Sequence, residues 1–344
     1  MLFSGLFSKK NAILGVDIGT SNIKIAQITH GEKAVLDTYG IVNSPYQLGG
    51  KNDSVALPAM AKLLKTLISR AGVTTNKCVI SFPNISVFSS VVELPKMGDA
   101  EMGAAVEHEA KKYIPLALAD IDLSWSVVSE PVAGLKGGNV KILLTAVPKQ
   151  ITKNYLQLFD MAGLEPEVGE IEALALIRSL IGNAATSCVI IDIGAKSTGL
   201  NVIEEGFLRL SRNLNIGGET ITAKIAQTLN ISETRAEQFK KDFGVSGTAF
   251  IPDAIRPILN IIKTEIKQLL TLYQSQYKKK PEKIILVGGG ANLPAAAQFF
   301  ADLEIPVELG NPLRAVSYGK SLAAILERYR LSLPIAIGLA LRKE

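Results

Sequence analysis

The sequence has 344 residues, of which 47% are hydrophobic and 20% are charged, and its formal net charge is +5. A chain of this length can bury two or more cores, because single hydrophobic cores stop growing near about 250–300 residues. The composition excludes a disordered or low-complexity protein. The basic residues form no dense stripe interleaved with aromatic residues, so no nucleic-acid partner is expected.

The cysteines and the chain ends indicate which compartment the protein occupies. Cys78 and Cys188 each begin an apolar, strand-like run and have no Cys or His at ligand spacing, so we expect two buried thiols in a reducing compartment. The apolar part of residues 1–10 is too short for a secretory signal, so we expect the segment to lie on a membrane surface, to pack on the fold as a short arm, or to be disordered. Residues 333–341 are apolar, but a bilayer requires about 20 residues, so a closing core helix is expected there.

The most informative feature is a duplicated hairpin. Residues 14–19 recur as residues 189–194 at a constant offset, and the register continues without a gap to Gly31 and Gly206. Each copy contains an apolar strand, an Asp-Ile-Gly corner, a second apolar strand and a turn. Two copies of one hairpin predict two similar domains that face each other.

The two corners carry residues suited to phosphate. Glycine permits a tight turn whose backbone N–H groups converge on an anion. A carboxylate beside phosphate is repulsive unless a cation lies between them, and Mg²⁺ held through water is the natural bridge. The corners supply the carboxylates Asp17 and Asp192, the glycines Gly19 and Gly194, and the hydroxyl residues Thr20, Ser21, Ser197 and Thr198.

The segment between the two copies reads as a compact β/α unit. An amphipathic helix is predicted over residues 97–113 with Asp99 as its N-cap. Strands 124–129 and 140–147 follow, and then a helix over 152–162 that ends at a glycine. In this segment His108 is expected to be a solvated helix residue, and Trp125 a core anchor.

A third glycine-rich turn, residues 288–290, follows the predicted strand 283–287 and precedes a predicted helix over 295–301. Backbone without side chains lets a flat ring approach closely. The glycines lack the spacing of a dinucleotide-binding fingerprint, and residues 194–198 lack the upstream glycine of a P-loop. Taken alone, the turn is also compatible with a bare strand-to-helix connection.

Together the two hairpins and the glycine turn resemble the superfamily of actin, Hsp70 and the sugar kinases. The resemblance implies an α/β, ribonuclease H-like fold of two duplicated domains that hold ATP and Mg²⁺ between them. It implies that Lys24 contacts phosphate and that Glu172 orients the attacking water, as the one catalytic candidate. Residues 217–219 and Lys224 would border the ribose and adenine.

The expected cofactor-binding residues are Asp17, Gly19, Thr20, Ser21, Asn22, Lys24, Asp192, Gly194, Ala195, Lys196, Ser197, Gly217, Gly218, Glu219, Lys224, Gly288, Gly289, Gly290 and Ala291, with Mg²⁺ held through water by Asp17 and Asp192. Ala195 stands where actin has a further carboxylate. The resemblance therefore implies a slow ATPase at most.

Over nearly the whole chain the sequence is similar to the PilM family of the type IV pilus machine, itself similar to the division protein FtsA. The Leu-Phe start and residues 107–115 and 336–342 carry this resemblance. It implies an inserted FtsA-like subdomain. The expected map is 1–84 with 170–187 and 331–344 as subdomain 1A, 85–169 as the insert 1C, 188–222 with 284–330 as subdomain 2A, and 223–283 as subdomain 2B.

The same resemblance implies a cytoplasmic, ATP-binding component of the pilus assembly platform that binds the cytoplasmic N-terminal segment of PilN. The protein would then lie at the bacterial inner membrane through that partner. Other pilus components, motor ATPases among them, and self-association are further candidates. Two alternatives stay open: a small-molecule kinase, although the short loop 43–54 offers no strong base, and a nucleotide-independent scaffold, although the corners are intact.

Overall fold

The computed structural model describes residues 11–48, 53–129, 138–246 and 250–343. The prediction for residues 1–10 lies outside the described residues. No helix in those ranges has the length and apolar character needed to cross a bilayer.

Two five-stranded sheets of the same topology form the centre of the molecule, in the orders β3-β2-β1-β4-β8 and β11-β10-β9-β12-β13. In each sheet three sequential strands pair antiparallel and two later strands add in parallel. The duplicated α/β fold expected from the repeated hairpin is therefore confirmed. The strands are β1 (Ala12–Ile18), β2 (Asn22–Thr29), β3 (Val35–Asn43), β4 (Lys77–Phe82), β8 (Glu165–Ile171), β9 (Ser187–Ile193), β10 (Thr198–Glu204), β11 (Phe207–Leu214), β12 (Lys283–Val287) and β13 (Val307–Leu309).

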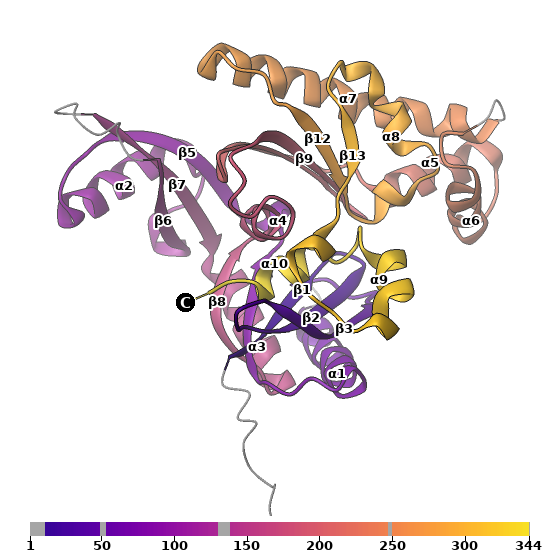
Figure 1. Ribbon diagram of the computed structural model, residues 1–344, viewed down its shortest axis with the longest axis horizontal. Coiled ribbons are helices and arrows are strands. Elements are labelled where there is room, and N and C mark those ends of the chain that lie inside the picture. The colour runs from indigo at the N-terminus through magenta and orange to yellow at the C-terminus, as the bar shows by residue number, and fades with distance from the viewer. Residues whose placement is uncertain (1–10, 49–52, 130–137, 247–249, 344) are drawn as a thin grey trace, which may run out of the picture.

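Helices cover both faces of each sheet, which is why β1 and β9 read as nearly continuous apolar runs. On the first sheet α1 (Asp53–Ala71) and α3 (Lys149–Ala162) share one core. On the second, α5 (Gly218–Leu229) and α7 (Phe250–Tyr277) pack on the outer face with α6 (Glu233–Phe243) beside them (Figure 1).

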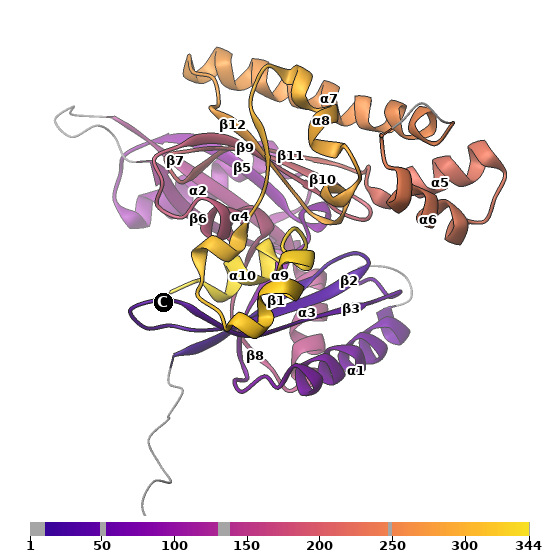
Figure 2. The ribbon, with the colours of Figure 1, turned by 45° about the vertical axis from the view of Figure 1, so that its right-hand side comes forward.

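Two helices lie between the sheets and join the domains. One buried cluster contains residues of β4, of α4 (Glu172–Leu180) and of β9. The closing helix α10 (Pro334–Ala340), expected at residues 333–341, is buried against β1 and α4. Figure 2 shows α4 and α10 between the two layers. The short helices α8 (Ala296–Phe299) and α9 (Ala323–Tyr329) complete the fold, and α8 is shorter than the predicted helix over 295–301.

An additional three-stranded antiparallel sheet, in the order β5-β7-β6, lies to one side. Its elements are β5 (Phe88–Pro95), α2 (Asp99–Tyr113), β6 (Ile121–Ser129) and β7 (Asn139–Pro148). The helix α2 packs on one face, and Trp125 is partly buried there, as expected of a core anchor. The predicted N-cap was wrong: Gly98 is the cap residue, and Asp99 is the first residue inside the helix.

The end of this insert differs from the expected boundary at residue 169. The helix α3 shares its core with α1, and β8 is a strand of the first sheet, although both fall within the range 85–169. We therefore propose that the inserted subdomain ends with β7 at Pro148.

The packing of α10 depends on two glycines and generates the first prediction. A Cβ on Gly338 would overlap the carbonyl oxygen of Ala175 in α4, and one on Gly15 would overlap that of Ala336. Although Gly-to-Ala usually stabilises a helix interior, we expect Gly338→Ala to lower the free energy of unfolding by about 2 kcal/mol or more, because backbone must move. Chemical denaturation measures this.

Gly103→Ala is the matched control, since Gly103 lies inside α2 and a Cβ there has nothing within 4 Å. It should stabilise the protein by about 0.5–1 kcal/mol. Equal effects of the two substitutions would contradict the close packing of α10.

Candidate functional site

The two Asp-Ile-Gly corners have the same backbone geometry. In the first, the Gly19 amide donates to the carbonyl oxygen of Asn22 at 3.0 Å; in the second, the Gly194 amide donates to that of Ser197 at 2.9 Å. Each corner joins two antiparallel strands, β1 to β2 and β9 to β10. The corners are therefore the turns of two equivalent hairpins, and these two turns face each other.

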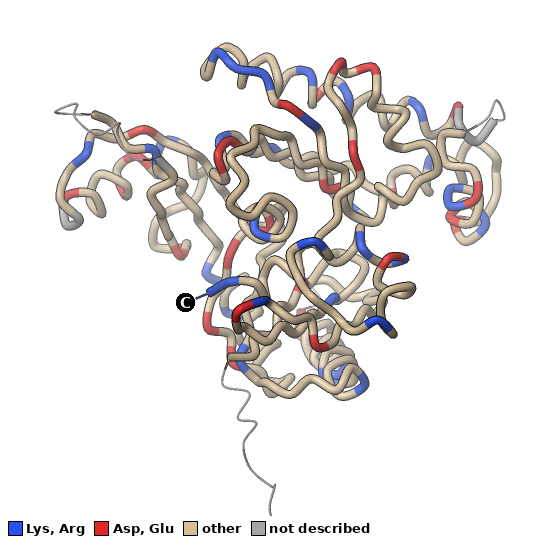
Figure 3. The backbone as a smooth tube through the Cα atoms, in the orientation of Figure 1, with Lys and Arg blue, Asp and Glu red and all other residues tan. Residues whose placement is uncertain are grey.

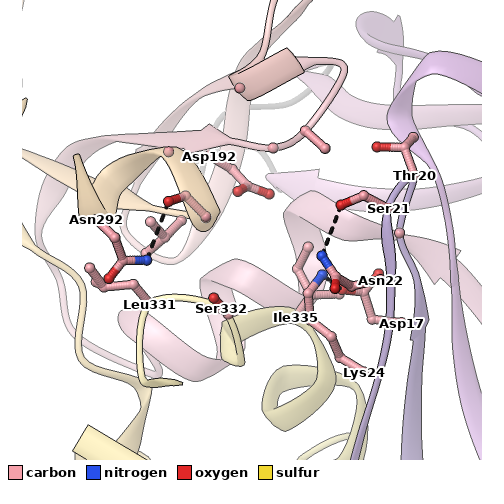
Figure 4. Close-up of a pocket in the computed structure, with 18 of the residues that line it drawn as sticks. Asp17, Thr20, Ser21, Asn22, Lys24, Asp192, Asn292, Leu331, Ser332 and Ile335 are labelled. Atoms are coloured by element: carbon pink, nitrogen blue, oxygen red, sulfur yellow. Dashed lines mark hydrogen bonds and ion pairs between the residues drawn. The ribbon is translucent and has the colours of Figure 1, made fainter. Parts of the chain in front are cut away.

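A cleft of about 1080 Å³ lies between the two domains, and both corners open into it (Figure 4). The predicted residues that line it are Asp17, Gly19, Thr20, Ser21, Asn22, Lys24, Glu172, Asp192, Gly194, Ala195, Ser197, Gly218, Glu219, Gly288, Gly289 and Gly290. Segments far apart in the sequence thus meet in one site.

Four predicted residues do not line the cleft: Lys196, Gly217, Lys224 and Ala291. The Lys196 ammonium lies 3.7 Å from Glu219, and Ala291 is buried behind the glycine turn. Lys224, predicted to border the ribose and adenine, lies on the exposed side of α5, where its Nζ donates to Gln227. Its position on an exposed helix face could not be judged from the spacing alone.

The start of α5 is bonded to the second corner. The amide of Gly218 donates to the Gly194 carbonyl at 2.9 Å, and that of Glu219 to the Ala195 carbonyl at 2.8 Å. Gly217 permits this contact, since a Cβ there would lie 2.5 Å from the Ala195 carbonyl oxygen. These residues therefore support the corner.

Sequence reasoning missed the charged residues that α6 contributes to the cleft, namely Glu237, Lys240 and Lys241. Lys240 is held in place, because its Nζ donates to the Gly218 carbonyl at 3.0 Å and to the Thr222 hydroxyl at 2.8 Å. Acidic and basic residues are mixed along this helix (Figure 3), a pattern typical of a solvated face, so nothing in its sequence indicates a site. The cleft is also lined by Asn292, Arg328, Tyr329, Leu331, Ser332 and Ile335.

The glycine turn after β12 is shaped by contact with the second corner. Gly288 has φ of 85°, and a Cβ on it would overlap the Asp192 carboxylate; a Cβ on Gly290 would overlap Ile193. Gly289 has nothing within 4 Å of its Cβ position. Two of the glycines therefore bring the turn against β9, and the middle one leaves open space in the wall of the cleft.

The floor of the cleft holds three carboxylates and one buried ammonium. Lys24 Nζ lies 2.8 Å from Asp17 Oδ2. Burial alone would lower the pKa of Lys24, but the Asp17 carboxylate raises it above its usual value. Burial raises the pKa of Asp192 to about 6, with Lys24 opposing and Asp17 adding to the shift. Burial and the carboxylates of Asp17 and Asp192 raise the pKa of Glu172 well above its usual range.

These shifts mean that one lysine does not balance the carboxylates around it. A cation beside Asp17 and Asp192 would restore the balance and would also bridge them to an anionic ligand. Among the described residues no three Asp, Glu, His or Cys side chains could together hold a metal ion. The donor set fits a hydrated ion held through water, with the hydroxyls of Thr20, Ser21 and Ser197 at the cleft left for phosphate oxygens. The Thr198 hydroxyl is buried and donates to the Ile216 carbonyl instead.

Glu172, the candidate water-orienting group, is the first residue of α4. Its Oε2 accepts a hydrogen bond from the backbone amide of Asn84 at 3.3 Å. The start of a helix favours a carboxylate electrostatically. Glu172 therefore lies in the cleft, and the backbone amide of Asn84 holds its carboxylate in place.

Comparison with known proteins supports the same family. The family model described as type IV pilus assembly protein PilM matches residues 15–344. A solved structure titled as the PilM–PilN type IV pilus biogenesis complex has 28% identity and a TM-score of 0.86, and the match covers 96% of this chain and 98% of that one. Neither the small-molecule kinase nor the nucleotide-independent scaffold is favoured by these matches.

More distant relatives share the fold. Cell division protein FtsA of Streptococcus pneumoniae is 23% identical over 337 residues, which cover 85% of this chain and 73% of FtsA. The structure of MreB5 of Spiroplasma citri bound to ADP is 17% identical, with a TM-score of 0.50 and coverage of 93% and 97%. The family match spans almost the entire sequence, and on that ground this chain belongs to the PilM family of type IV pilus assembly proteins.

Proposed function

We propose that this protein binds ATP and Mg²⁺ in the cleft and holds the cytoplasmic N-terminal segment of PilN, as part of the assembly platform of the type IV pilus. The observation that carries the proposal is the likeness, over nearly the whole of both chains, to a PilM–PilN complex. Through that partner the protein would lie on the cytoplasmic side of the bacterial inner membrane.

The cleft geometry supports nucleotide binding. The corners at Gly19 and Gly194 face each other as paired phosphate-binding turns, and Lys24 supplies a buried positive charge between them. Asp17 and Asp192 would hold Mg²⁺ through water. The glycine turn and the residues of α6 would border the base and ribose, and MreB5 holds ADP on the same fold.

The partner site would be a groove beside the inserted subdomain. This subdomain packs on β11 of the second domain, and its chain connections run into the first domain. Closure of the two domains around a nucleotide would therefore change its surroundings. A coupling of about 1–3 kcal/mol is enough to gate binding of a partner.

Calorimetric titration with a synthetic N-terminal peptide of PilN from the same organism tests the partner. We expect binding, with an affinity that changes about fivefold or more when ATP·Mg²⁺ is added. A peptide of the same composition in scrambled order is the control. Absence of binding in both nucleotide states would overturn the PilN assignment.

Hydrolysis should be slow, because Ala195 offers no carboxylate at the second corner, which leaves Glu172 as the candidate water-orienting group. We expect single-turnover rates below about 1 s⁻¹. Rates of about 1–100 s⁻¹, the range of efficient kinases, would instead support an enzyme whose function is the phosphoryl-transfer reaction itself. Rapid-quench measurement with labelled ATP distinguishes the two.

The variant Asp192→Asn tests two effects of this carboxylate, on the affinity for ATP·Mg²⁺ and on the stability of the folded state. We expect Mg²⁺-dependent ATP affinity to fall by at least about tenfold, because the variant cannot balance the ion. Calorimetry with and without Mg²⁺ measures this. Unchanged affinity in a folded variant would refute the assignment of Asp192.

The same variant should be more stable than the unaltered protein when metal and nucleotide are absent. The pKa of Asp192 rises from 3.8 to about 6 on folding, so ionisation disfavours the folded state. We expect a melting temperature about 2–5 °C higher at neutral pH. The advantage should disappear as the pH falls from about 6 toward 3.8, since the carboxyl then takes up its proton.

A further inference from the structure

The chain enters and leaves the inserted subdomain beside the cleft. After β4 it makes a short turn, Asn84–Ser86, and enters β5; it returns through α3 and β8 to Glu172. The Asn84 amide donates to Glu172 Oε2 at 3.3 Å, a bond between residues 88 positions apart. Both residues line the cleft, so one hydrogen bond at the cleft wall ties the two connections of the insert together.

The second domain reaches the same point. Asn213 on β11 donates from Nδ2 to the carbonyl oxygen of Asn84 at 3.3 Å. β11 is an edge strand of the second sheet, and β5 of the insert packs beside it (Figure 2). A buried cluster that includes Leu143 of the insert and Leu208 of β11 adjoins this contact. Asn84 therefore bonds to both domains at the root of the insert.

Three asparagine side chains converge over Gly199, directly behind the second corner. A Cβ at Gly199 would lie 3.2 Å from Asn84 Nδ2 and 3.6 Å from both Asn201 Nδ2 and Asn213 Oδ1. Gly199 lines the cleft and pairs with Asp192 across β9 and β10. Any displacement of the second corner must therefore move the floor of this cluster.

The cluster holds two polar atoms that make no hydrogen bond among the described residues. They are Asn201 Nδ2 and Asn213 Oδ1, and both are buried. One is a donor and the other an acceptor, and leaving such groups unpaired is costly. A rotation of Asn213 toward Asn201 would pair them and release the carbonyl of Asn84. Elements with two discrete arrangements are what carries coupling between sites.

We propose that Asn84, Asn201 and Asn213 form a polar junction that couples occupancy of the cleft to the position of the inserted subdomain. Nucleotide at the second corner shifts Gly199, the junction changes its hydrogen bonds, and β5 moves relative to β11. The inference rests on the proposed nucleotide site and adds how nucleotide binding there would change the position of the inserted subdomain.

Amide hydrogen exchange of the full chain, with and without ATP·Mg²⁺, tests the junction in unaltered protein and in Asn213→Ala. Protection at residues 17–24 reports nucleotide binding. We expect nucleotide to change exchange at residues 84–95 about fivefold in the unaltered protein and less than about twofold in Asn213→Ala, with protection at 17–24 kept in both. Asn213 does not line the cleft, so its replacement leaves the nucleotide contacts in place.

Arg212→Ala is the matched control, because Arg212 lies on the same strand but pairs with Glu265 of α7 at 2.6 Å. It should retain the full response at residues 84–95. If Asn213→Ala does not fold, Asn213→Leu takes its place in the experiment, because leucine has a similar volume and cannot make the hydrogen bond.

The outcomes separate the two proposals. An unaltered protein without protection at residues 17–24 would overturn the nucleotide site itself. Protection there without a response at residues 84–95, or an equal response in Asn213→Ala and the control, would overturn the junction alone. The PilN peptide gives a second readout, since its nucleotide dependence should fall below about twofold in Asn213→Ala.

Discussion

The structure depends on a charge imbalance at the meeting point of its two domains. Asp17, Asp192 and Glu172 face one cleft, and among the described residues the ion pair of Lys24 is with Asp17. A buried carboxylate whose charge is not balanced disfavours its own ionisation, and burial accordingly raises the pKa of Asp192 and Glu172. Such a site is unfavourable by itself. Under the proposed function, a cation and an anionic ligand would balance its charges and so favour closure of the two domains.

Close backbone packing keeps these charges in position. Gly15 and Gly338 allow α10 to lie directly on β1 and α4, and Gly288 and Gly290 allow the third turn to lie on β9. Side chains at these points would displace the strands whose ends carry Asp17 and Asp192. Because α4 packs against strands of both sheets, a displacement of either domain would also displace Glu172, the first residue of α4. The scaffold is therefore stiff where the site is built.

Sequence patterns predicted those parts of the candidate site that are built from contiguous residues. Each corner is a short strand-turn-strand unit, so residues such as Gly19 and Gly194 could be assigned from the repeat itself, and the glycine turn likewise. The contribution of α6 could not, since Lys240 reaches the cleft through the packing of α6 on α5 and not through any spacing. The same reason explains why Lys224 lies away from the cleft and why the proposed end of the insert differs from the expected one, because α3 joins the core of the first domain by its packing and not by its place in the chain.

The two copies of the hairpin are equivalent in backbone but not in chemistry. Asp17 pairs across its hairpin with Lys24, whereas Asp192 pairs with Gly199 at the equivalent position. The first copy therefore carries its own counter-charge. The second has no lysine at that position and, under the proposed function, would be balanced by a bound cation. The missing side chain at Gly199 also leaves the space into which Asn84, Asn201 and Asn213 converge. The glycine at this position of the second copy thus leaves Asp192 without a paired lysine, and it also provides the space in which the proposed junction lies.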